Sequence, residues 1–269
     1  MLKQRVITAI VLAVIFLVAL FGFGKTLFAA FLIVIAGLCA WEWAAIGGLR
    51  DDPRRYAYVS GNMLLILVLQ MLFADPGSLR FLLLFAMIWW LVVCLMLYLQ
   101  PVENRSASGF SGFYLLAGPL TVVPALMSAQ YLRDSMSPWL LLYALAVVWA
   151  MDIGAYFTGK RWGKNKLAPL ISPGKTIEGV LGGVVAAIVL CLLALLLRDD
   201  STPRAFTLLL ATIIAGGISV VGDLFESRGK RMAGMKDSGT LLPGHGGILD
   251  RLDSAFAALP LFAFVLLWI

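Results

Sequence analysis

The 269-residue sequence has few charged residues, few cysteines and a single histidine, and each shortage excludes a class of protein. Charged residues make up 13% of the chain, whereas the residues AVILMFWYC make up 61%. Soluble proteins carry about 25% charged and about 45–50% apolar residues. Because water cannot accommodate so much apolar surface, a soluble enzyme, a disordered protein and a secreted disulfide scaffold are excluded. The composition predicts an integral membrane protein.

The cysteines and the histidine exclude a zinc site of the usual Cys/His type. Cys39, Cys94 and Cys191 each lie within an apolar run, and none has a second cysteine at metal-ligand spacing. His245 is the only histidine, whereas such zinc sites need several cysteine or histidine ligands. Residues 1–5 and the apolar run after them resemble a signal peptide without a small-x-small cleavage site, so we expect a retained first span.

Long apolar runs predict an all-α polytopic membrane protein with about nine transmembrane helices. A bilayer core of about 30 Å needs about 20 apolar residues in a helix. The runs that meet this requirement lie at 6–23, 27–46, 56–73, 79–99, 113–132, 138–157, 177–197, 205–225 and 249–269. We expect residues 1–137 to form a scaffold of about five spans and residues 138–269 to carry the chemistry.

Lysine and arginine are distributed unevenly over the predicted loops. About three quarters of the 21 fall on the side of the membrane that carries the N-terminus. The positive-inside rule therefore places the N-terminus in the cytoplasm and the C-terminus outside. Two loops on the cytoplasmic side, 158–176 and 226–248, are long and rich in glycine and lysine, and we expect the active residues there.

Several carboxylates fall inside the predicted spans, where an unpaired charge is costly and marks a functional candidate. Glu42 stands between Trp41 and Trp43, so we interpret it as an interfacial residue of an aromatic belt that reaches water. Converging carboxylates without histidine partners suit Mg²⁺, which prefers oxygen ligands and commonly bridges to phosphates. All of these acidic residues lie toward the cytoplasmic ends of their spans: Glu42, Asp152, Glu178, Asp223, Asp250 and Asp253.

Two glycine-containing segments lead into predicted helices and suit anions. Residues 172–179 (SPGKTIEG) precede the span at 177–197, and residues 243–250 (PGHGGILD) precede the span at 249–269. Helix N-termini carry partial positive charge and free N–H groups that bind phosphate, and glycine lets the backbone approach closely. Lysines and arginines of the two loops add positive charge, although part of that charge only fixes topology or touches anionic lipid.

Residues 174–176, Gly-Lys-Thr, resemble the end of a P-loop but do not belong to one. The pattern G-x-x-x-x-G-K-[ST] requires a glycine at position 169, where this sequence has Pro169. We also expect no β-strand before this segment.

Short polar segments of the second half form a distinctive pattern: 227–231 (SRGKR), 236–239 (KDSG) and 243–253 (PGHGGILDRLD), with upstream support from 152–156 (DIGAY), 159–160 (GK) and 172–176 (SPGKT). Together these segments closely resemble the signature of the phosphatidate cytidylyltransferases (CDP-diacylglycerol synthases). Gly229 departs from the family pattern, which has a bulky apolar residue there, and Ile177 stands where an aromatic is common. Neither departure removes a charged group.

The resemblance implies Mg²⁺-dependent synthesis of CDP-diacylglycerol and pyrophosphate from CTP and phosphatidate. The lipid phosphate would attack the α-phosphorus of CTP, so catalysis is positioning plus neutralisation of charge. It further implies a bacterial inner-membrane enzyme with a cytoplasmic active site, and a homodimer. A second cation remains open, and no nucleic-acid partner is expected. Gly179 and Gly183 form a small-xxx-small pair suited to packing helices within or between chains.

The expected site residues fall into three groups. The expected metal ligands are Asp223, Asp250 and Asp152, and the expected catalytic residues are Asp223, Asp250, Asp253, Lys236 and His245. The residues expected to bind substrate are Ser172, Lys175, Thr176, Ser227, Lys230, Arg231, Gly244, Gly246, Gly247 and Arg251. Because phosphatidate is already ionised at neutral pH, we expect His245 to bind or orient a phosphate, with proton transfer and the shaping of a turn as the alternatives.

Three other functions compete with this interpretation. A CTP-dependent lipid-alcohol kinase would use the same metal and nucleotide but would need a base for its hydroxyl substrate. A secondary transporter would bind ions with buried carboxylates midway through the bilayer, whereas these carboxylates cluster at one membrane face. An inactive assembly scaffold would leave the loop glycines unexplained.

Overall fold

The structure is a computed structural model that describes residues 2–50, 52–73, 75–99, 111–197, 202–244 and 246–268. Its elements in chain order are α1 (Leu2–Gly22), α2 (Lys25–Ile46), α3 (Arg54–Leu72), α4 (Pro76–Leu99), α5 (Gly112–Tyr131), the π-helix η1 (Leu132–Met136), α6 (Pro138–Trp162), β1 (Lys166–Ala168), β2 (Ser172–Thr176), α7 (Ile177–Leu196), α8 (Thr202–Met232) and α9 (Leu249–Trp268).

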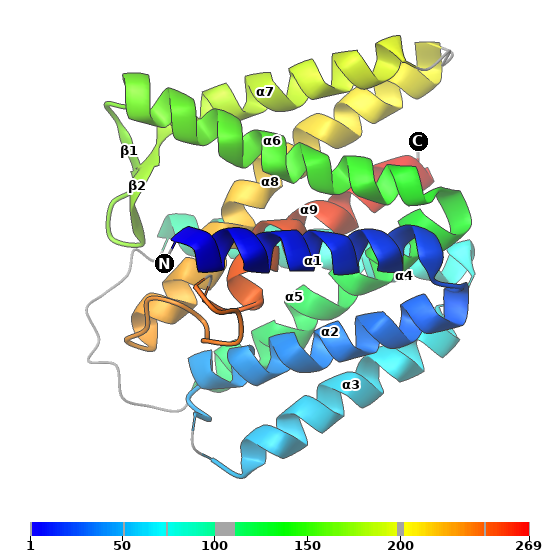
Figure 1. Cartoon of the computed structure of the whole chain (residues 1–269), viewed down its shortest axis with the longest axis vertical. Coiled ribbons are helices and arrows are strands. Elements are labelled where there is room, and N and C mark those ends of the chain that lie inside the picture. The colour runs from blue at the N-terminus through cyan, green and yellow to red at the C-terminus, as the bar shows by residue number, and fades with distance from the viewer. Residues whose placement is uncertain are drawn as a thin grey trace.

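The helices form a polytopic bundle, which confirms the predicted all-α membrane fold. Within the described ranges, eight helices are long and apolar enough to cross a membrane, and Val6–Gly22 of α1 adds a shorter apolar helix. Figure 1 shows the long helices lying side by side, with β1 and β2 at one end of the bundle and the C-terminus toward the other. Large apolar side chains of α1, α3, α4 and α7 are exposed, as lipid-facing surfaces require.

The loop predicted at 226–248 is shorter than expected, because α8 continues past residue 225 to Met232. The charges of residues 226–231 ended the apolar run, but this segment holds good helix formers, and Lys230 pairs with Glu226 at i,i+4. In the same way, α6 continues past residue 157 to Trp162. Lys160 and Arg161 lie in its last turn, where cations complement the helix dipole.

Residues 166–176 form a β-hairpin, so the expectation of no strand at this place is wrong. β1 and β2 are antiparallel, with Lys166 opposite Thr176 and Ala168 opposite Ser172. Glu178 fixes the start of the hairpin, because its carboxylate accepts hydrogen bonds from Lys164 N at 3.1 Å and from Asn165 Nδ2 at 2.7 Å. The hairpin therefore places Lys175, on β2, at the end of the bundle.

An aromatic cluster around Phe225 attaches α8 to the N-terminal half of the chain. The Phe225 ring lies 5.8–6.4 Å, centroid to centroid, from five rings on α2, α4 and α5, namely Trp43, Trp89, Trp90, Phe113 and Tyr114. Tyr114 also explains the departure at Gly229, since a Cβ there would lie 2.7 Å from Tyr114 Cε1. A bulky residue would not fit beside this tyrosine.

Glycines bring α6 and α7 into close contact within the chain. A Cβ on Gly183 would lie 2.7 Å from Met151 O, and one on Gly179 would lie 2.9 Å from Ala155 O. The small-xxx-small pair that these two glycines form thus packs α7 against α6.

A pair of Gly→Ala variants tests this packing. Gly183→Ala should lower the free energy of unfolding by about 1–3 kcal/mol, because the added methyl forces α6 and α7 apart. Gly217→Ala is the matched control: its Cβ meets nothing within 4 Å, so the better helix propensity of alanine should leave stability equal or raise it by up to about 1 kcal/mol. Thermal unfolding in detergent measures both, and equal stability of the two variants would contradict the close contact.

Candidate active site

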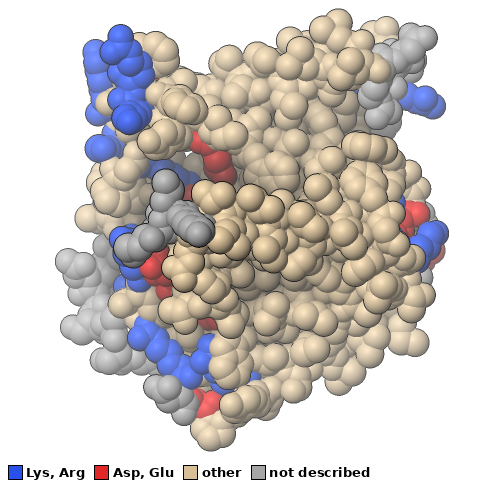
Figure 2. Space-filling view, in the orientation of Figure 1, with Lys and Arg blue, Asp and Glu red and all other residues tan. Residues whose placement is uncertain are grey.

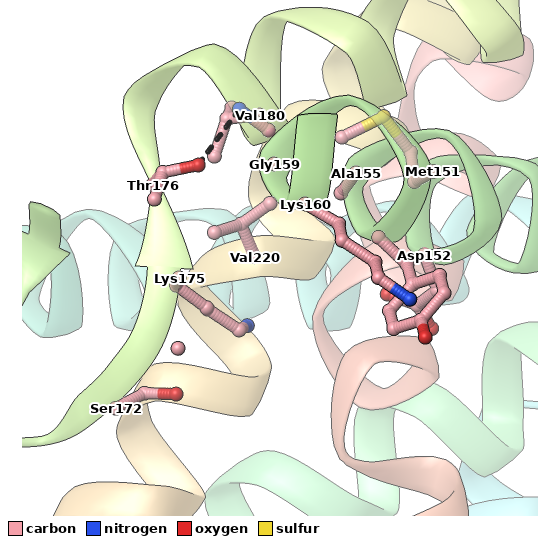
Figure 3. A pocket seen from close by; sticks show the side chains of 13 residues that line it. Met151, Asp152, Ala155, Gly159, Lys160, Ser172, Lys175, Thr176, Val180 and Val220 are labelled. Carbon is pink, nitrogen blue, oxygen red and sulfur yellow. Dashed lines mark hydrogen bonds between the residues drawn. The ribbon is translucent and has the colours of Figure 1, made fainter. Parts of the chain in front are cut away.

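A cavity of about 410 Å³ lies between α6, the hairpin, α7 and α8. Figure 3 shows Lys175 and Ser172 entering this space from β2 and Asp152 lying on its α6 side. The remaining wall is largely apolar and includes Met151, Ala155, Val180 and Val220. In Figure 2, acidic side chains are visible in a hollow on the face drawn. The cavity therefore combines a charged end with an apolar wall.

Asp223 contacts two groups, one of which, Lys175, lines the cavity. Lys175 Nζ lies 2.5 Å from Asp223 Oδ2, and both side chains are a quarter exposed. Ser227, one turn further along α8, donates its hydroxyl to Asp223 Oδ1 at 3.0 Å. Asp152 interacts electrostatically with Lys175 and Asp223. The structure thus brings together four residues that sequence analysis had selected.

Two other predicted substrate-binding residues are engaged in local structure. Thr176 is buried, and its hydroxyl accepts a hydrogen bond from Gly179 N at 3.1 Å, so it is the N-cap of α7 (Figure 3). Arg231 is exposed and donates from Nε to Ile171 O at 3.4 Å, which ties the end of α8 to the hairpin.

A second charged group lies further along α8, around Lys230. Lys230 Nζ contacts Asp250 Oδ1 on α9 at 2.5 Å and Glu226 Oε1 at 3.3 Å. Asp250 Oδ2 also accepts hydrogen bonds from Ser238 N at 3.0 Å and Gly247 N at 2.9 Å. One carboxylate therefore joins α8, the start of α9 and the loop between them.

Sequence analysis missed Glu226, which belongs to the same group. It is 2% exposed, and its Oε1 lies 3.3 Å from Lys230 Nζ. Its carboxyl group lies beside that of Asp253, which in turn interacts electrostatically with Asp223. The spacing of Asp223, Glu226 and Lys230 along one helix face could have identified it, had the predicted span not ended at 225.

Glu42 is not the water-reaching belt residue that sequence analysis inferred. It is 1% exposed and accepts hydrogen bonds from the loop and the start of α9, so α2 takes part in the site. The hydropathy pattern around the flanking tryptophans could not reveal a contact with a segment 196 residues away.

The loop between α8 and α9 needs its glycines for its own geometry. Gly244 and Gly246 have φ values of 78° and 83°, which only glycine adopts readily. A Cβ on Gly247 would overlap Glu42 Oε2 and Ser238 Oγ. Lys236 and Arg251 are exposed beside this loop, and His245 lies outside the described residues.

The carboxylates suit a divalent cation that also uses oxygens of a substrate. Among the residues that the structure describes, no three acidic, cysteine or histidine side chains are arranged to hold a metal by themselves. Mg²⁺ commonly takes one or two carboxylates and completes its shell with water and phosphate oxygens. The buried Glu226 carboxylate, next to that of Asp253, provides hard oxygen ligands of this kind.

The sequence matches known proteins over its whole length. Residues 3–269 match the model of the cytidylyltransferase family. The chain is similar to the phosphatidate cytidylyltransferase of Pseudomonas aeruginosa, at 41% identity over 100% of this chain and 97% of that protein. Its similarity to the proteins of the same name from Haemophilus influenzae and Bacillus subtilis is 39% and 34% identity, over 98% of this chain in each case and 98% and 97% of those proteins.

Matched Lys→Met variants test the electrostatics of the two groups. Lys230→Met leaves Glu226 and Asp250 buried without their ammonium group, so we expect the free energy of unfolding to fall by about 3–5 kcal/mol. Lys175→Met removes a partly exposed ion pair, and the free energy of unfolding should fall by only about 0–1 kcal/mol. Thermal unfolding of both purified variants in detergent compares them, and equal losses would show that the Lys230 group is not a buried electrostatic core.

Proposed function

Because this chain belongs to the cytidylyltransferase family, we propose that it transfers CMP from CTP to phosphatidate, giving CDP-diacylglycerol and pyrophosphate. The membrane bundle and the names of the relatives make the chain a membrane nucleotidyltransferase. The observation that carries the specific reaction is a pair of carboxylate–lysine contacts made by α8: Asp223 of α8 with Lys175, which lines the cavity, and Lys230 of α8 with Asp250 of α9.

The cavity supports a lipid phosphate as one substrate. Lys160, Ser172 and Lys175 provide cationic and hydroxyl groups for the phosphate of phosphatidate. The apolar wall formed by Met151, Val180 and other residues suits the start of the acyl chains. We place the triphosphate of CTP next to it, toward the loop between α8 and α9, where Arg231, Lys236 and Arg251 are exposed.

The reaction itself needs orientation and charge neutralisation rather than a strong base. A phosphate oxygen of phosphatidate attacks the α-phosphorus of CTP, and the bond from that phosphorus to the bridging oxygen of pyrophosphate breaks. Because the attacking oxygen is already ionised, no proton has to be removed from it. Lys175 and Lys230, which now neutralise Asp223 and Asp250, are placed to turn toward phosphate oxygens when substrates arrive.

We propose Mg²⁺ as the cofactor, held by carboxylates of α8 and α9 together with the substrate phosphates. Asp223 and Asp250 are the first ligand candidates, with Asp152, Asp253 and the newly found Glu226 close to them. The bound ion would neutralise charge on the triphosphate and its leaving group. The homodimer and a second cation remain predictions from the family resemblance.

We also propose that the site faces the cytoplasm of a bacterial inner membrane. Lys and Arg gather mostly at the end of the bundle that carries the hairpin and the start of α1 (Figures 1 and 2), in agreement with the positive-inside rule. Because CTP does not cross a bilayer, external CTP should support the reaction in inverted membrane vesicles and not in right-side-out vesicles. The opposite result would reverse the orientation.

The Asp250→Asn variant tests the reaction and its site together. With radiolabelled CTP, Mg²⁺ and phosphatidate, the wild-type protein should yield a lipid carrying CMP, and Asp250→Asn should lower the rate at least about 10²-fold, a loss of the size seen when one electrostatic group of a site is removed. Asp75→Asn is the control, since Asp75 likewise accepts a backbone hydrogen bond, from Ser78 N at 3.0 Å, at the start of another helix.

Two results would overturn the proposal. A phosphorylated lipid alcohol as product would indicate a kinase, and near-normal activity of Asp250→Asn would remove this residue from the site. Asp75→Asn should retain the wild-type rate.

A further inference from the structure

We propose that Glu42 is a positioning residue that fixes the loop between α8 and α9 and thereby sets the place of Asp250. It lies on α2, in the half of the chain that sequence analysis regarded as scaffold. The inference rests on the proposed function only in that it treats Asp250 as part of the active site.

The Glu42 carboxylate replaces a local N-cap for α9. Glu42 Oε2 accepts a hydrogen bond from Leu249 N at 2.9 Å, and Oε1 accepts one from Ile248 N at 3.1 Å. The first N–H groups of a helix have no partner within the helix, and a negative charge at this end is favoured by the helix dipole. A buried carboxylate and the buried start of a helix thus satisfy each other.

Ser238 links Glu42 directly to Asp250. Its hydroxyl donates to Glu42 Oε2 at 2.7 Å, while its backbone N–H donates to Asp250 Oδ2 at 3.0 Å. Ser238 is 2% exposed, so neither bond competes with bulk water. A displacement of the Glu42 carboxylate would therefore move the same residue that orients Asp250.

The glycines around Glu42 show how closely the loop is fitted to it. A Cβ on Gly239 would lie 2.6 Å from Glu42 Oε1, and a Cβ on Gly247 would overlap Oε2. Gly247 also donates its N–H to Asp250 Oδ2 at 2.9 Å. The middle of the loop, at Gly239, and its end, at Gly247, therefore both lie against Glu42, and Ser238 and Gly247 hold Asp250.

The substitution Glu42→Gln tests this role with two measurements. The amide keeps one oxygen acceptor but turns an NH₂ group toward N–H and O–H donors, so the loop should loosen. We expect hydrogen exchange of the amides of 238–249 to become at least about tenfold faster. We also expect kcat to fall about 10–100-fold with little change in KM for phosphatidate, because a misplacement of about 1 Å is costly in catalysis whereas the cavity lining is untouched.

Two further variants serve as controls. Glu178→Gln changes the same chemical group, which there binds Lys164 N and Asn165 N, so it should speed exchange in the hairpin region and not at 238–249. Ser238→Ala removes one hydrogen bond to Glu42 but keeps the backbone N–H that donates to Asp250, so exchange at 238–249 and kcat should change less than in Glu42→Gln. In the double variant of Glu42→Gln and Ser238→Ala, kcat should be little lower than in Glu42→Gln alone, because both changes break the same link.

The outcomes separate this role from a purely structural one and from failure of the proposed reaction. Wild-type exchange at 238–249 in Glu42→Gln, or an unchanged kcat for the folded fraction, would overturn the inference. If Glu42→Gln does not fold, Ser238→Ala decides: unchanged exchange and kcat would refute the link. If the wild-type protein makes no CDP-diacylglycerol, the exchange measurement still shows whether Glu42 holds the loop.

Discussion

The charged interior of this membrane protein depends on the ion pairs that the ammonium group of Lys230 forms with carboxylates. It contacts Asp250 on α9 and Glu226 on α8, and Asp253 lies within electrostatic range. Ionised carboxylates inside a membrane bundle are costly unless they are paired. Because α8 and α9 both contribute charges, their packing and the neutralisation of the site depend on each other. The same helix carries Asp223, whose partner Lys175 comes from the hairpin.

This arrangement explains how one bundle can serve both a soluble nucleotide and a lipid. The cavity has an apolar wall that includes Met151 and Val180, whereas Asp152, Lys160 and Lys175 supply its charge. Under the proposed function, a metal ion bound by the carboxylates would take over the charge that Lys175 and Lys230 now neutralise and would free both lysines for substrate phosphates. The N-terminal half contributes more than a scaffold, because the rings around Phe225 fix α8 and Glu42 holds the start of α9.

The sequence predicted the helices well because the bilayer imposes long apolar runs, which hydropathy detects directly. It failed where polar residues continue a helix, as at Glu226, or build a hairpin, as around Lys175. Of the selected residues, Asp152, Lys175, Asp223 and Ser227 lie in one group and Lys230 and Asp250 in another, because buried charges need partners. The role of Glu42 could not be predicted, because it depends on a contact with a loop 196 residues away rather than on any local pattern.

The central claim is that the buried carboxylates of α8 and α9 hold a divalent cation together with the triphosphate. The most direct test is the thermal unfolding of the purified protein with CTP alone and with CTP plus Mg²⁺ at equal ionic strength. A ligand present at 100 times its Kd stabilises the folded state by about 2.7 kcal/mol. The account predicts a rise in Tm that needs both components and is lost when Asp223→Asn and Asp250→Asn are combined. An equal rise without the divalent cation, or an undiminished rise in that double variant, would contradict it.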